Sequence, residues 1–273
     1  MNPSGATRVA GIIGWPVDQS RSPAIHNAAF AALGLDWIYL AFPVRPGDAS
    51  RAPAAMRALG IRGLNVTMPH KREVMAALDE LSPEAERAGA VNTIVADGRR
   101  LIGMNTDGPG FVRFLERDVG VVPAGRRTLV LGAGGAARAV ALALGDAGAD
   151  VVVAARRRDQ ADEVAALVKN GRTVPYDAAA IDGELGGISI LVNATPAGRE
   201  GETLPLDPAR LGDGHVVVDL IYHPETTPLV RTALERGAKA FNGIGMLVHQ
   251  AALSFEAWTG VPAPIDAMRA AVA

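Results

Sequence analysis

A glycine-rich turn between a strand and a helix constrains the fold of this chain more than any other sequence feature. Residues 128–137 read T-L-V-L-G-A-G-G-A-A, so Gly132, Gly134 and Gly135 follow an apolar strand and open a helix. Glycine permits a tight turn and close approach of the backbone to a pyrophosphate, and a small residue such as Ala136 allows close packing of helix on strand. Because the free N–H groups at a helix start also favour phosphate, the turn predicts a dinucleotide-binding α/β domain.

The strand after this helix predicts which dinucleotide is bound. NAD-binding domains usually carry Asp or Glu at its end, where the carboxylate accepts a hydrogen bond from the ribose 2′-hydroxyl. Here the strand 151–154 runs into Arg156 and Arg157. Guanidinium groups can bind a 2′-phosphate bidentately, whereas a carboxylate would repel it. The sequence therefore favours NADP(H) over NAD, the alternative interpretation being a solvated basic loop.

Strand-length apolar runs alternate with helical stretches along the chain, which is typical of βαβ units and a largely parallel sheet. The first series has expected strands and helices at 9–13, 22–33, 38–44, 50–59, 64–68, 71–81 and 91–95. The second series surrounds the glycine-rich turn, with elements at 108–118, 128–131, 136–148, 151–154, 159–170, 173–175, 188–192 and 215–220. The last helix, 245–259, is expected to pack back on the first series.

The predicted fold class is therefore α/β with two domains. A discontinuous N-terminal α/β substrate domain is expected at residues 1–106 plus 242–273. A Rossmann-type dinucleotide-binding domain is expected at residues 107–241. Continuous apolar strands around the turn suit a sheet covered by helices on both faces.

Composition narrows the kinds of site and partner. The absence of cysteine excludes disulfides and thiolate metal sites, and the five histidines show no metal-ligand spacing, so no metal is expected. A net charge of −2 gives no reason to expect a nucleic-acid partner. No signal-like or membrane-length apolar run is present, so a cytoplasmic protein without a membrane partner is expected, as monomer or homodimer.

Polar segments follow the predicted strands, at the edge where open α/β sheets bind ligands. They read G-W-P-V-D-Q-S-R-S-P-A-I-H-N at 14–27, N-V-T-M-P-H-K at 65–71, A-V-N-T at 90–93 and N-T-D-G-P-G at 105–110. Three later segments read N-A-T-P-A-G at 193–198, D-L-I-Y-H-P-E-T-T-P-L at 219–229 and N-G-I-G-M-L-V-H-Q-A-A-L-S-F-E-A-W-T-G at 242–260. With the glycine-rich turn, they resemble the shikimate dehydrogenase family, in the family's order and over essentially the whole chain.

The resemblance implies reversible hydride transfer between NADPH and the ring carbonyl of 3-dehydroshikimate, giving shikimate in aromatic amino-acid biosynthesis. It implies that the small-molecule substrate is held by Ser20, Ser22, Asn65, Thr67, Asn92, Tyr222 and Gln250. It assigns to the dinucleotide Gly132, Gly134, Gly135, Ala136, Arg156, Arg157, Thr195, Gly243 and Met246. Lys71 and Asp107 are expected to carry the chemistry, with Lys71 acting either as acid and base or as an electrostatic clamp.

One position departs from the family pattern and leaves the substrate open. The family usually has histidine before the first serine, whereas this chain has Gln19, preceded by Asp18, which is expected to face solvent. Glutamine donates and accepts hydrogen bonds but does not titrate. The alternatives are a quinate or aminoshikimate dehydrogenase of the same superfamily, with NAD as a candidate cofactor, and a non-catalytic dinucleotide-binding regulator. The presence of both Lys71 and Asp107 argues against the regulator.

Structural interpretations compete with the functional ones. Ser20 and Ser22 could simply cap the helix that contains Pro23. Lys71 is expected at the start of a helix, where a cation is electrostatically unfavourable, so packing does not explain it. The histidines are expected to be structural or exposed. Large apolar side chains of the last helix, Phe255 and Trp258, are expected to anchor it in a core.

Overall fold

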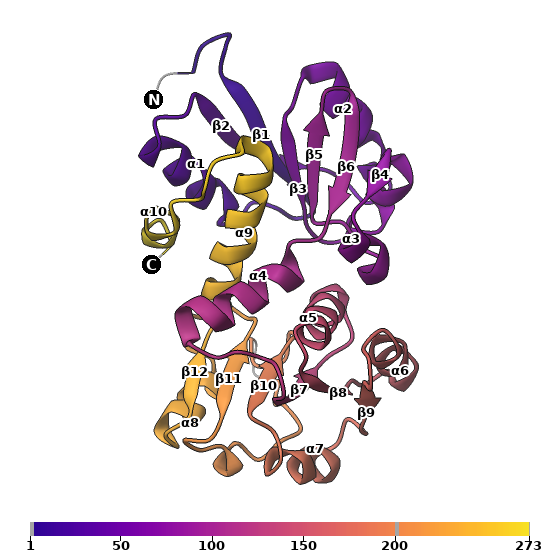
Figure 1. Ribbon diagram of the computed structural model, residues 1–273, viewed down its shortest axis with the longest axis vertical. Helices are drawn as coiled ribbons and strands as arrows, with labels where there is room; N and C mark the ends of the chain where they lie inside the picture. The colour runs from indigo at the N-terminus through magenta and orange to yellow at the C-terminus, as the bar shows by residue number, and fades with distance from the viewer. Residues whose placement is uncertain (1–2, 200–201, 273) are drawn as a thin grey trace. The chain divides into compact units, whose positions relative to one another are not determined.

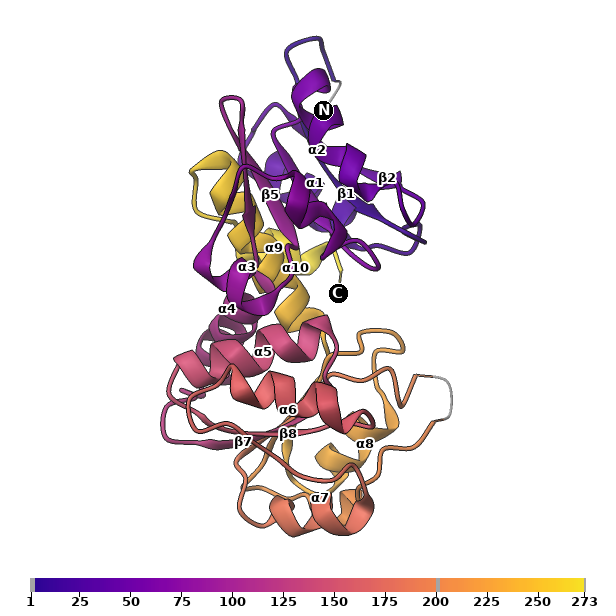
Figure 2. The ribbon, with the colours of Figure 1, turned by 90° about the vertical axis from the view of Figure 1, so that its right-hand side faces the viewer.

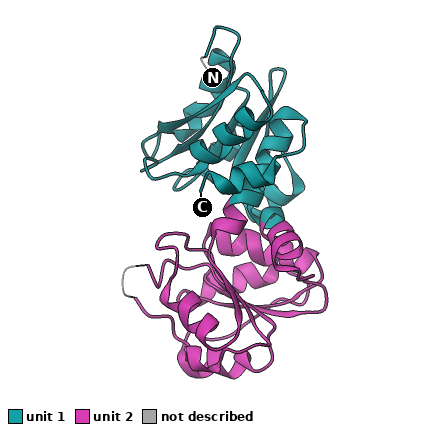
Figure 3. Cartoon of the chain, turned by 90° about the vertical axis from the view of Figure 1, so that its left-hand side faces the viewer, with its two compact units in different colours: residues 1–110, 248–273 teal, residues 111–247 magenta. Residues whose placement is uncertain are grey.

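The computed structural model describes residues 3–199 and 202–272, and the chain divides into two compact units (Figure 3). Unit 1 comprises Met1–Gly110 and Val248–Ala273, and unit 2 comprises Phe111–Leu247. Helices α4 (Asp107–Phe114) and α9 (Ile244–Thr259) each contribute residues to both units. Each unit is a sheet with helices, which confirms the α/β fold class.

The sheet of unit 1 has six strands in the order β2-β1-β3-β5-β6-β4 (Figure 1). Their bounds are β1 Arg8–Gly14, β2 Trp37–Pro43, β3 Gly63–Val66, β4 Glu80–Leu81, β5 Thr93–Asp97 and β6 Arg100–Met104. Strands β1, β2 and β3 are parallel, but β5 is antiparallel to both β3 and β6. Strand β4 is parallel to β6, so three of the five strand pairs described in this sheet are parallel, and only the two pairs made by β5 depart from the predicted parallel arrangement. Strand β6 was not predicted, although Asp97 pairs with Arg100 across a two-residue hairpin turn, Gly98 and Arg99, with Gly98 at φ +59°.

Helices cover both faces of this sheet. They are α1 Ser22–Ala32, α2 Ala52–Leu59, α3 Pro83–Ala88, α10 Ile265–Ala270 and the short 3₁₀ helices η1 Ala49–Arg51 and η2 Glu73–Ala77. The last helix packs on the first series of elements, as expected. Trp258 Nε1 donates to Ile94 O at 3.0 Å, and the rings of Phe255 and Phe30 lie 5.3 Å apart, so both aromatic residues anchor α9 as predicted.

The segment after β3 differs from its prediction. Residues 71–81 were expected to form one helix, but they form a turn, η2 and the short strand β4. The neighbouring backbone explains the difference, because Val91 N donates to Lys71 O at 2.8 Å and Asp79 N donates to Leu101 O at 3.0 Å. These hydrogen bonds tie both ends of the segment to the sheet. Lys71 consequently lies in a turn and does not begin a helix.

The sheet of unit 2 is entirely parallel, with the order β12-β11-β10-β7-β8-β9. Its strands are β7 Arg127–Leu131, β8 Asp150–Ala154, β9 Arg172–Thr173, β10 Ile190–Asn193, β11 Val216–Asp219 and β12 Lys239–Phe241. Figure 2 shows α5 (Gly135–Asp146) and α6 (Arg158–Ala166) on one face, with α7 (Ala178–Leu185) and α8 (Pro228–Glu235) on the other. The π-helical turn η3 Leu115–Val119 and the 3₁₀ helix η4 Pro208–Arg210 complete the unit.

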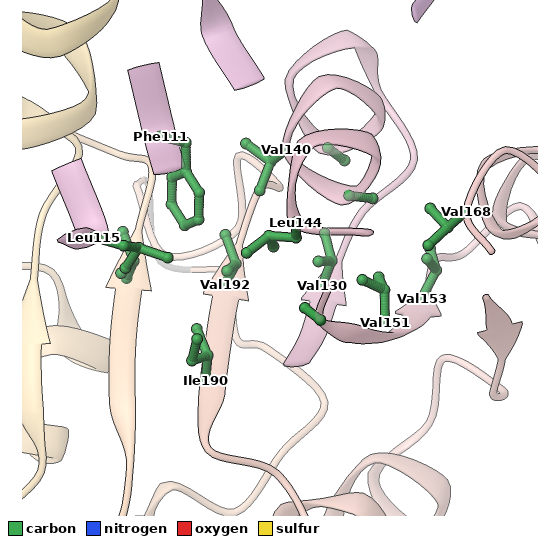
Figure 4. Close-up of a cluster of buried hydrophobic side chains, with 14 of the residues drawn as sticks. Phe111, Leu115, Val130, Val140, Leu144, Val151, Val153, Val168, Ile190 and Val192 are labelled. Atoms are coloured by element: carbon green, nitrogen blue, oxygen red, sulfur yellow. The ribbon is translucent and has the colours of Figure 1, made fainter. Parts of the chain in front are cut away.

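A hydrophobic core lies beneath α5 and α6 (Figure 4). Val130 and Val192 of the strands meet Val140 and Leu144 of α5, and all four are fully buried. A second core on the opposite face contains Leu129 and the apolar side chains of α7 and α8. The central strands are thus buried on both sides, as their continuous apolar sequences predict.

Candidate active site

Lys71 and Asp107 form an ion pair in unit 1. Lys71 Nζ donates to Asp107 Oδ2 at 2.5 Å, and the side chains are only 23% and 10% exposed. Asp107 is the first residue of α4, where the helix dipole favours a negative charge. Lys71 is held by its own carbonyl, which accepts the Val91 N–H next to the start of β5. The fold therefore brings the two predicted catalytic residues together, although they are far apart in the sequence.

Asn92 occupies the other side of the same carboxylate. Its Nδ2 donates to Asp107 Oδ1 at 2.8 Å, so each carboxylate oxygen has its own donor. Thr106 N donates to Asn92 Oδ1 at 2.8 Å, which fixes the orientation of the amide. Gln250 Oε1 lies 3.5 Å from Asn92 Nδ2. The structure thus brings together four of the predicted site residues, namely Lys71, Asn92, Asp107 and Gln250.

Asn65 belongs to a buried network beside this cluster. Tyr39 OH donates to Asn65 Oδ1 at 2.6 Å, and Asn65 Nδ2 lies 3.0 Å from Ser254 Oγ and 3.1 Å from Thr93 Oγ1. Ser254 Oγ also lies 3.3 Å from Thr106 Oγ1, which links Asn65 to the partner of Asn92. Asn65 has internal partners for both ends of its amide, so it holds the site together, whether or not it also contacts a substrate.

Sequence reasoning missed four members of this network: Tyr39, Thr93, Thr106 and Ser254. Each is buried in unit 1. The available signal was a hydroxyl in an otherwise apolar strand or helix, since buried polar groups need hydrogen-bond partners. Sequence alone does not show which hydroxyls face one another across the sheet.

The two serines lie at the start of α1 and do not act as its N-cap. The N-cap residue is Arg21, without a side-chain capping bond, and Ser20 Oγ accepts from Ser22 N at 3.3 Å. Ser22 is buried and interacts with the Tyr39 hydroxyl. Burial raises the pKa of Tyr39 well above its usual value, and the hydrogen bond with Ser22 opposes this increase. Ser22 therefore continues the network that runs through Asn65.

Residues flanking these positions are more open. Thr67 directly follows β3 and is half-buried, and its N–H donates to Ile13 O at 2.9 Å. Asp18 and Gln19 are exposed, as expected for Asp18. His26 and His70 are fully buried, in keeping with structural roles.

A hollow of about 770 Å³ lies over the glycine-rich turn of unit 2. Of the residues predicted to bind the dinucleotide, Gly132, Gly134, Arg156, Arg157 and Thr195 line it. Helix α5 begins beside it at Gly135, with Ala136 in the first turn, and no side chain caps its N–H groups. Uncapped N–H groups at a helix start are the usual ligands of a pyrophosphate.

Glycine is required at two of the predicted positions. Gly132 has φ +114°, and a Cβ there would lie 3.0 Å from Ala194 O. A Cβ on Gly243 would lie 2.2 Å from Leu220 O. Gly132 shapes the hollow itself, whereas Gly243 is not part of its lining.

The remaining predicted residues of unit 2 lie outside this hollow. Met246 is 8% exposed and packs in the core that contains Phe111 and Phe114. Tyr222 is half-buried in the loop between β11 and α8. Neither residue lines the hollow.

The basic run at the end of β8 supplies exposed cations to the hollow. Within residues 3–199 and 202–272, the structure gives Arg156 and Arg157 no ion pair, whereas Arg158 pairs with Asp162 at 3.0 Å. Tyr176 also lines the hollow and was missed by sequence reasoning. Burial raises the pKa of Tyr176, and a hydrogen bond with Thr195 opposes this effect.

Neither a metal site nor a membrane-spanning helix is found among the described residues. No group of His, Asp and Glu side chains there is arranged to hold a metal ion. No helix of that part of the chain is long and apolar enough to cross a membrane.

Comparisons with known proteins point to one family. The family models described as "Shikimate dehydrogenase substrate binding domain" and "Shikimate 5'-dehydrogenase C-terminal domain" match residues 12–94 and 243–273. The shikimate dehydrogenase (NADP(+)) of Geobacter metallireducens is 46% identical, over 98% of this chain and 97% of its own.

Solved structures agree in fold. The Thermus thermophilus shikimate 5-dehydrogenase in complex with NADP(H) and shikimate gives a TM-score of 0.88 at 38% identity, covering 97% of this chain and 98% of its own. The quinate dehydrogenase of Corynebacterium glutamicum in complex with NAD gives 0.89 at 33% identity, with coverages of 97% and 98%.

Proposed function

Because this chain belongs to the shikimate dehydrogenase family, we propose that it catalyses the reversible reduction of 3-dehydroshikimate to shikimate by NADPH. The observation that carries the proposal is the partly buried Lys71–Asp107 ion pair, at 2.5 Å, within a network of hydrogen-bonded polar residues. Such a pair places a proton donor where a substrate alcohol or carbonyl could be held. A regulator that only bound a dinucleotide would not need it.

Residues of unit 2 fit NADP(H). The glycine-rich turn and the uncapped start of α5 would hold the pyrophosphate, and exposed Arg156 and Arg157 would hold the 2′-phosphate. When bound, the dinucleotide supplies or accepts the hydride. Gly243 and Met246 are proposed to lie along the nicotinamide, as the family resemblance implies.

Lys71 would move the proton that accompanies the hydride. Addition of hydride to the carbonyl carbon converts the C=O double bond into an alkoxide, which must gain a proton. The Lys71 ammonium can polarise the carbonyl oxygen and donate that proton, and in oxidation neutral lysine takes it back. Asp107 holds the lysine in place through Oδ2, and Asn92 holds Asp107 through Oδ1.

The family resemblance implies which polar side chains would orient the substrate. Ser20 and Ser22 are proposed to bind its carboxylate, with Tyr222 as a further contact. Thr67, Asn92 and Gln250 are proposed to bind the ring hydroxyls. Asn65 is proposed to contact the ring too, although its hydrogen bonds to Tyr39 and Ser254 already give it a positioning role.

A spectrophotometric assay with two substrates and two cofactors tests the proposal. We expect reduced-nicotinamide absorbance to rise fastest with shikimate and NADP. Faster turnover of quinate with NAD would favour the second candidate, to which the likeness to a quinate dehydrogenase and the exposed Gln19 give some support. Binding of NADP without turnover of either substrate would favour a regulator.

A cytoplasmic location and a monomeric or homodimeric state remain proposals. The cytoplasmic location is supported by the proposed reaction, because its substrate and cofactor are small molecules that diffuse freely. Sedimentation of the purified chain would distinguish monomer from dimer.

A further inference from the structure

Two sequence segments of unit 2, 193–198 and 219–229, meet at one buried carboxylate. The register of the parallel strands pairs Asn193 with Asp219, at the carboxyl ends of β10 and β11. Both side chains are fully buried, and Asn193 Nδ2 donates to Asp219 Oδ1 at 3.0 Å. Neither residue lines the hollow over the glycine-rich turn, and the proposed mechanism uses neither.

Asn193 holds one wall of that hollow. Its Oδ1 accepts from Thr195 N at 3.0 Å and from Thr195 Oγ1 at 2.7 Å. Its Nδ2 also donates to Ala197 O at 3.1 Å. Thr195 and Ala197 are both lining residues. The conformation of residues 194–197, the pocket loop, therefore depends on the orientation of a single amide.

Asp219 holds the loop that carries Tyr222. Its Oδ1 accepts from Ile221 N at 3.1 Å, and its Oδ2 accepts from Thr227 Oγ1 at 2.7 Å. Thr227 is the N-cap of α8, where its hydroxyl also accepts from Val230 N at 3.3 Å. Residues 220–227, the tyrosine loop, are thus bonded to one carboxylate on both sides of Tyr222.

A buried carboxylate at position 219 is not needed for packing alone. Burial raises the pKa of Asp219, and hydrogen bonds from Thr227, Ile221 and Asn193 oppose that effect. A protein is often at least as stable when buried charged groups are replaced by well-packed apolar residues of similar volume. What an apolar residue cannot supply is a set of directional acceptors that orients two loops at once.

We propose that Asp219 is a positioning residue that sets the pocket loop through Asn193 and the tyrosine loop through Ile221 and Thr227. The inference rests on the proposed function, because it takes the first loop as part of the cofactor site and Tyr222 as a substrate contact. The hydrogen bonds of Asp219 thus form two branches: a pocket-loop branch through Asn193, and a tyrosine-loop branch through Ile221 and Thr227. Each branch can be removed separately. Loss of the pocket-loop branch should weaken NADPH binding, and loss of the tyrosine-loop branch should raise the KM for shikimate.

The test compares variants of the full chain that remove one branch or both. Asn193→Ala removes the pocket-loop branch, Thr227→Val removes the hydroxyl of the tyrosine-loop branch, and Asp219→Ala removes both. Asp219→Asn is the conservative variant, because its oxygen can accept from Asn193 and Ile221 while its NH₂ donates to the Thr227 hydroxyl. Thr173→Val is a matched control, since it breaks a Thr–Asp hydrogen bond of the same 2.7 Å length on the surface of unit 2.

The readouts are the NADPH dissociation constant, from nucleotide fluorescence, the shikimate KM and kcat, and the melting temperature. We expect Asn193→Ala to raise the NADPH dissociation constant roughly tenfold and Thr227→Val to raise shikimate KM by a similar factor, each with little effect on the other constant. Asp219→Ala should change both constants, and Asp219→Asn should restore both to near wild-type values. Thr173→Val should change neither.

The proposal would be overturned if the two single-branch variants did not affect the NADPH dissociation constant and the shikimate KM separately. If Asn193→Ala and Thr227→Val lower the melting temperature but leave both constants unchanged, or shift both constants equally, the carboxylate has only a structural role. This remains decidable if Asp219→Ala does not fold, because the two single-branch variants keep the carboxylate. Absence of shikimate turnover by the wild type would instead refute the proposed function, and the NADPH titration of Asn193→Ala would still test the pocket-loop branch.

Discussion

The two proposed binding regions are built from different parts of the polypeptide. In unit 1, the proposed site consists of side chains that are hydrogen-bonded to one another: Asp107 accepts from Lys71 on one carboxylate oxygen and from Asn92 on the other. In unit 2, the proposed site consists of a glycine turn, uncapped helix N–H groups and the exposed cations Arg156 and Arg157 around a hollow. A locked network suits groups that must be correctly placed in a transition state, whereas an open basic hollow suits affinity and the choice of dinucleotide.

This contrast predicts that changes in unit 1 act mainly on turnover and changes in unit 2 mainly on cofactor binding. The largest effect is expected for Lys71→Ala. Loss of general acid–base catalysis should lower kcat by about 10²–10⁴-fold. The NADPH dissociation constant should barely change, because the proposed dinucleotide site lies in unit 2. Steady-state kinetics and nucleotide fluorescence measure the two quantities.

Lys169→Ala is a suitable control, since Lys169 is an exposed lysine of unit 2. Asp107→Ala should give a defect similar to that of Lys71→Ala, and the double variant should be little worse, because residues that act as a unit are non-additive. A Lys71→Ala enzyme with near-normal kcat would contradict the assignment and direct attention to Tyr222.

The next effect is expected in the basic run of unit 2. Arg156→Asp replaces a charge-assisted hydrogen bond with a repulsion, and such a bond is worth about 1.5–3 kcal/mol, so KM for NADP should rise roughly tenfold or more. KM for NAD, which has no 2′-phosphate, should change much less. Arg158→Asp is the matched control, because Arg158 pairs with Asp162 and does not line the hollow. An unchanged KM for NADP in Arg156→Asp would show that the phosphate is bound elsewhere.

A smaller effect is expected at the start of α1. Changing both Ser20 and Ser22 to alanine should raise substrate KM, by about tenfold for each hydrogen bond to the substrate carboxylate that is removed. Cofactor affinity should remain as in the wild type. If substrate KM is unchanged, the serines only shape the start of the helix.

Gln19→His should keep shikimate activity, and conversion from quinate to shikimate preference would instead identify Gln19 as a specificity switch.

The smallest effect on activity, and a specific one on stability, is expected at His26. Burial lowers the pKa of this imidazole to about 3, opposed only in part by Asn65, and its ring stacks on Tyr39 at 4.4 Å. Because the folded pKa lies below the unfolded value, unfolding takes up a proton between about pH 6.5 and pH 3. The stabilisation is complete above pH 6.5 and is lost as the pH falls through this window, by at most about 1.4 kcal/mol per pH unit.

His26→Phe keeps a ring against Tyr39 and removes the titration. Urea unfolding of wild type and variant between pH 7 and pH 4 should show a steeper loss of free energy of unfolding for the wild type. Tryptophan fluorescence reports on unit 1 specifically, because Trp15, Trp37 and Trp258 all lie in it. Parallel pH profiles for the two proteins would show that His26 titrates normally in the folded state.

In unit 2, the raised pKa of Asp219 acts in the opposite sense, since its contribution to stability is lost as the pH rises through that pKa.

The comparison also shows which parts of the molecule sequence patterns can predict. The parallel sheet of unit 2 and the exposed arginines after β8 followed from local patterns, because strand, turn and helix there are consecutive in the chain. The hairpin of β5 and β6 was missed because its apolar runs were read within a βαβ pattern. The segment from Lys71 to Leu81 was predicted as a helix, whereas the hydrogen bonds from Val91 N to Lys71 O and from Asp79 N to Leu101 O hold it against the sheet.

The network of unit 1 is the part that sequence could not supply. Tyr39, Thr93 and Ser254 come from three separate segments and meet only in the folded unit. The family resemblance named Asn65 as a substrate contact, yet not as the centre of a hydrogen-bonded group. The roles of all these residues, and the domain limits at 106–107 and 241–242, remain predictions for the variants described above.

The central claim is that this chain transfers a hydride between the alcohol carbon of shikimate and NADP. The most direct measurement uses shikimate deuterated at that carbon, with mass spectrometry of the reduced dinucleotide formed by the wild-type chain. The account predicts NADPH that carries the deuterium, formed more slowly by Lys71→Ala. Formation of unlabelled NADPH, or of none while quinate is oxidised with NAD, would contradict it.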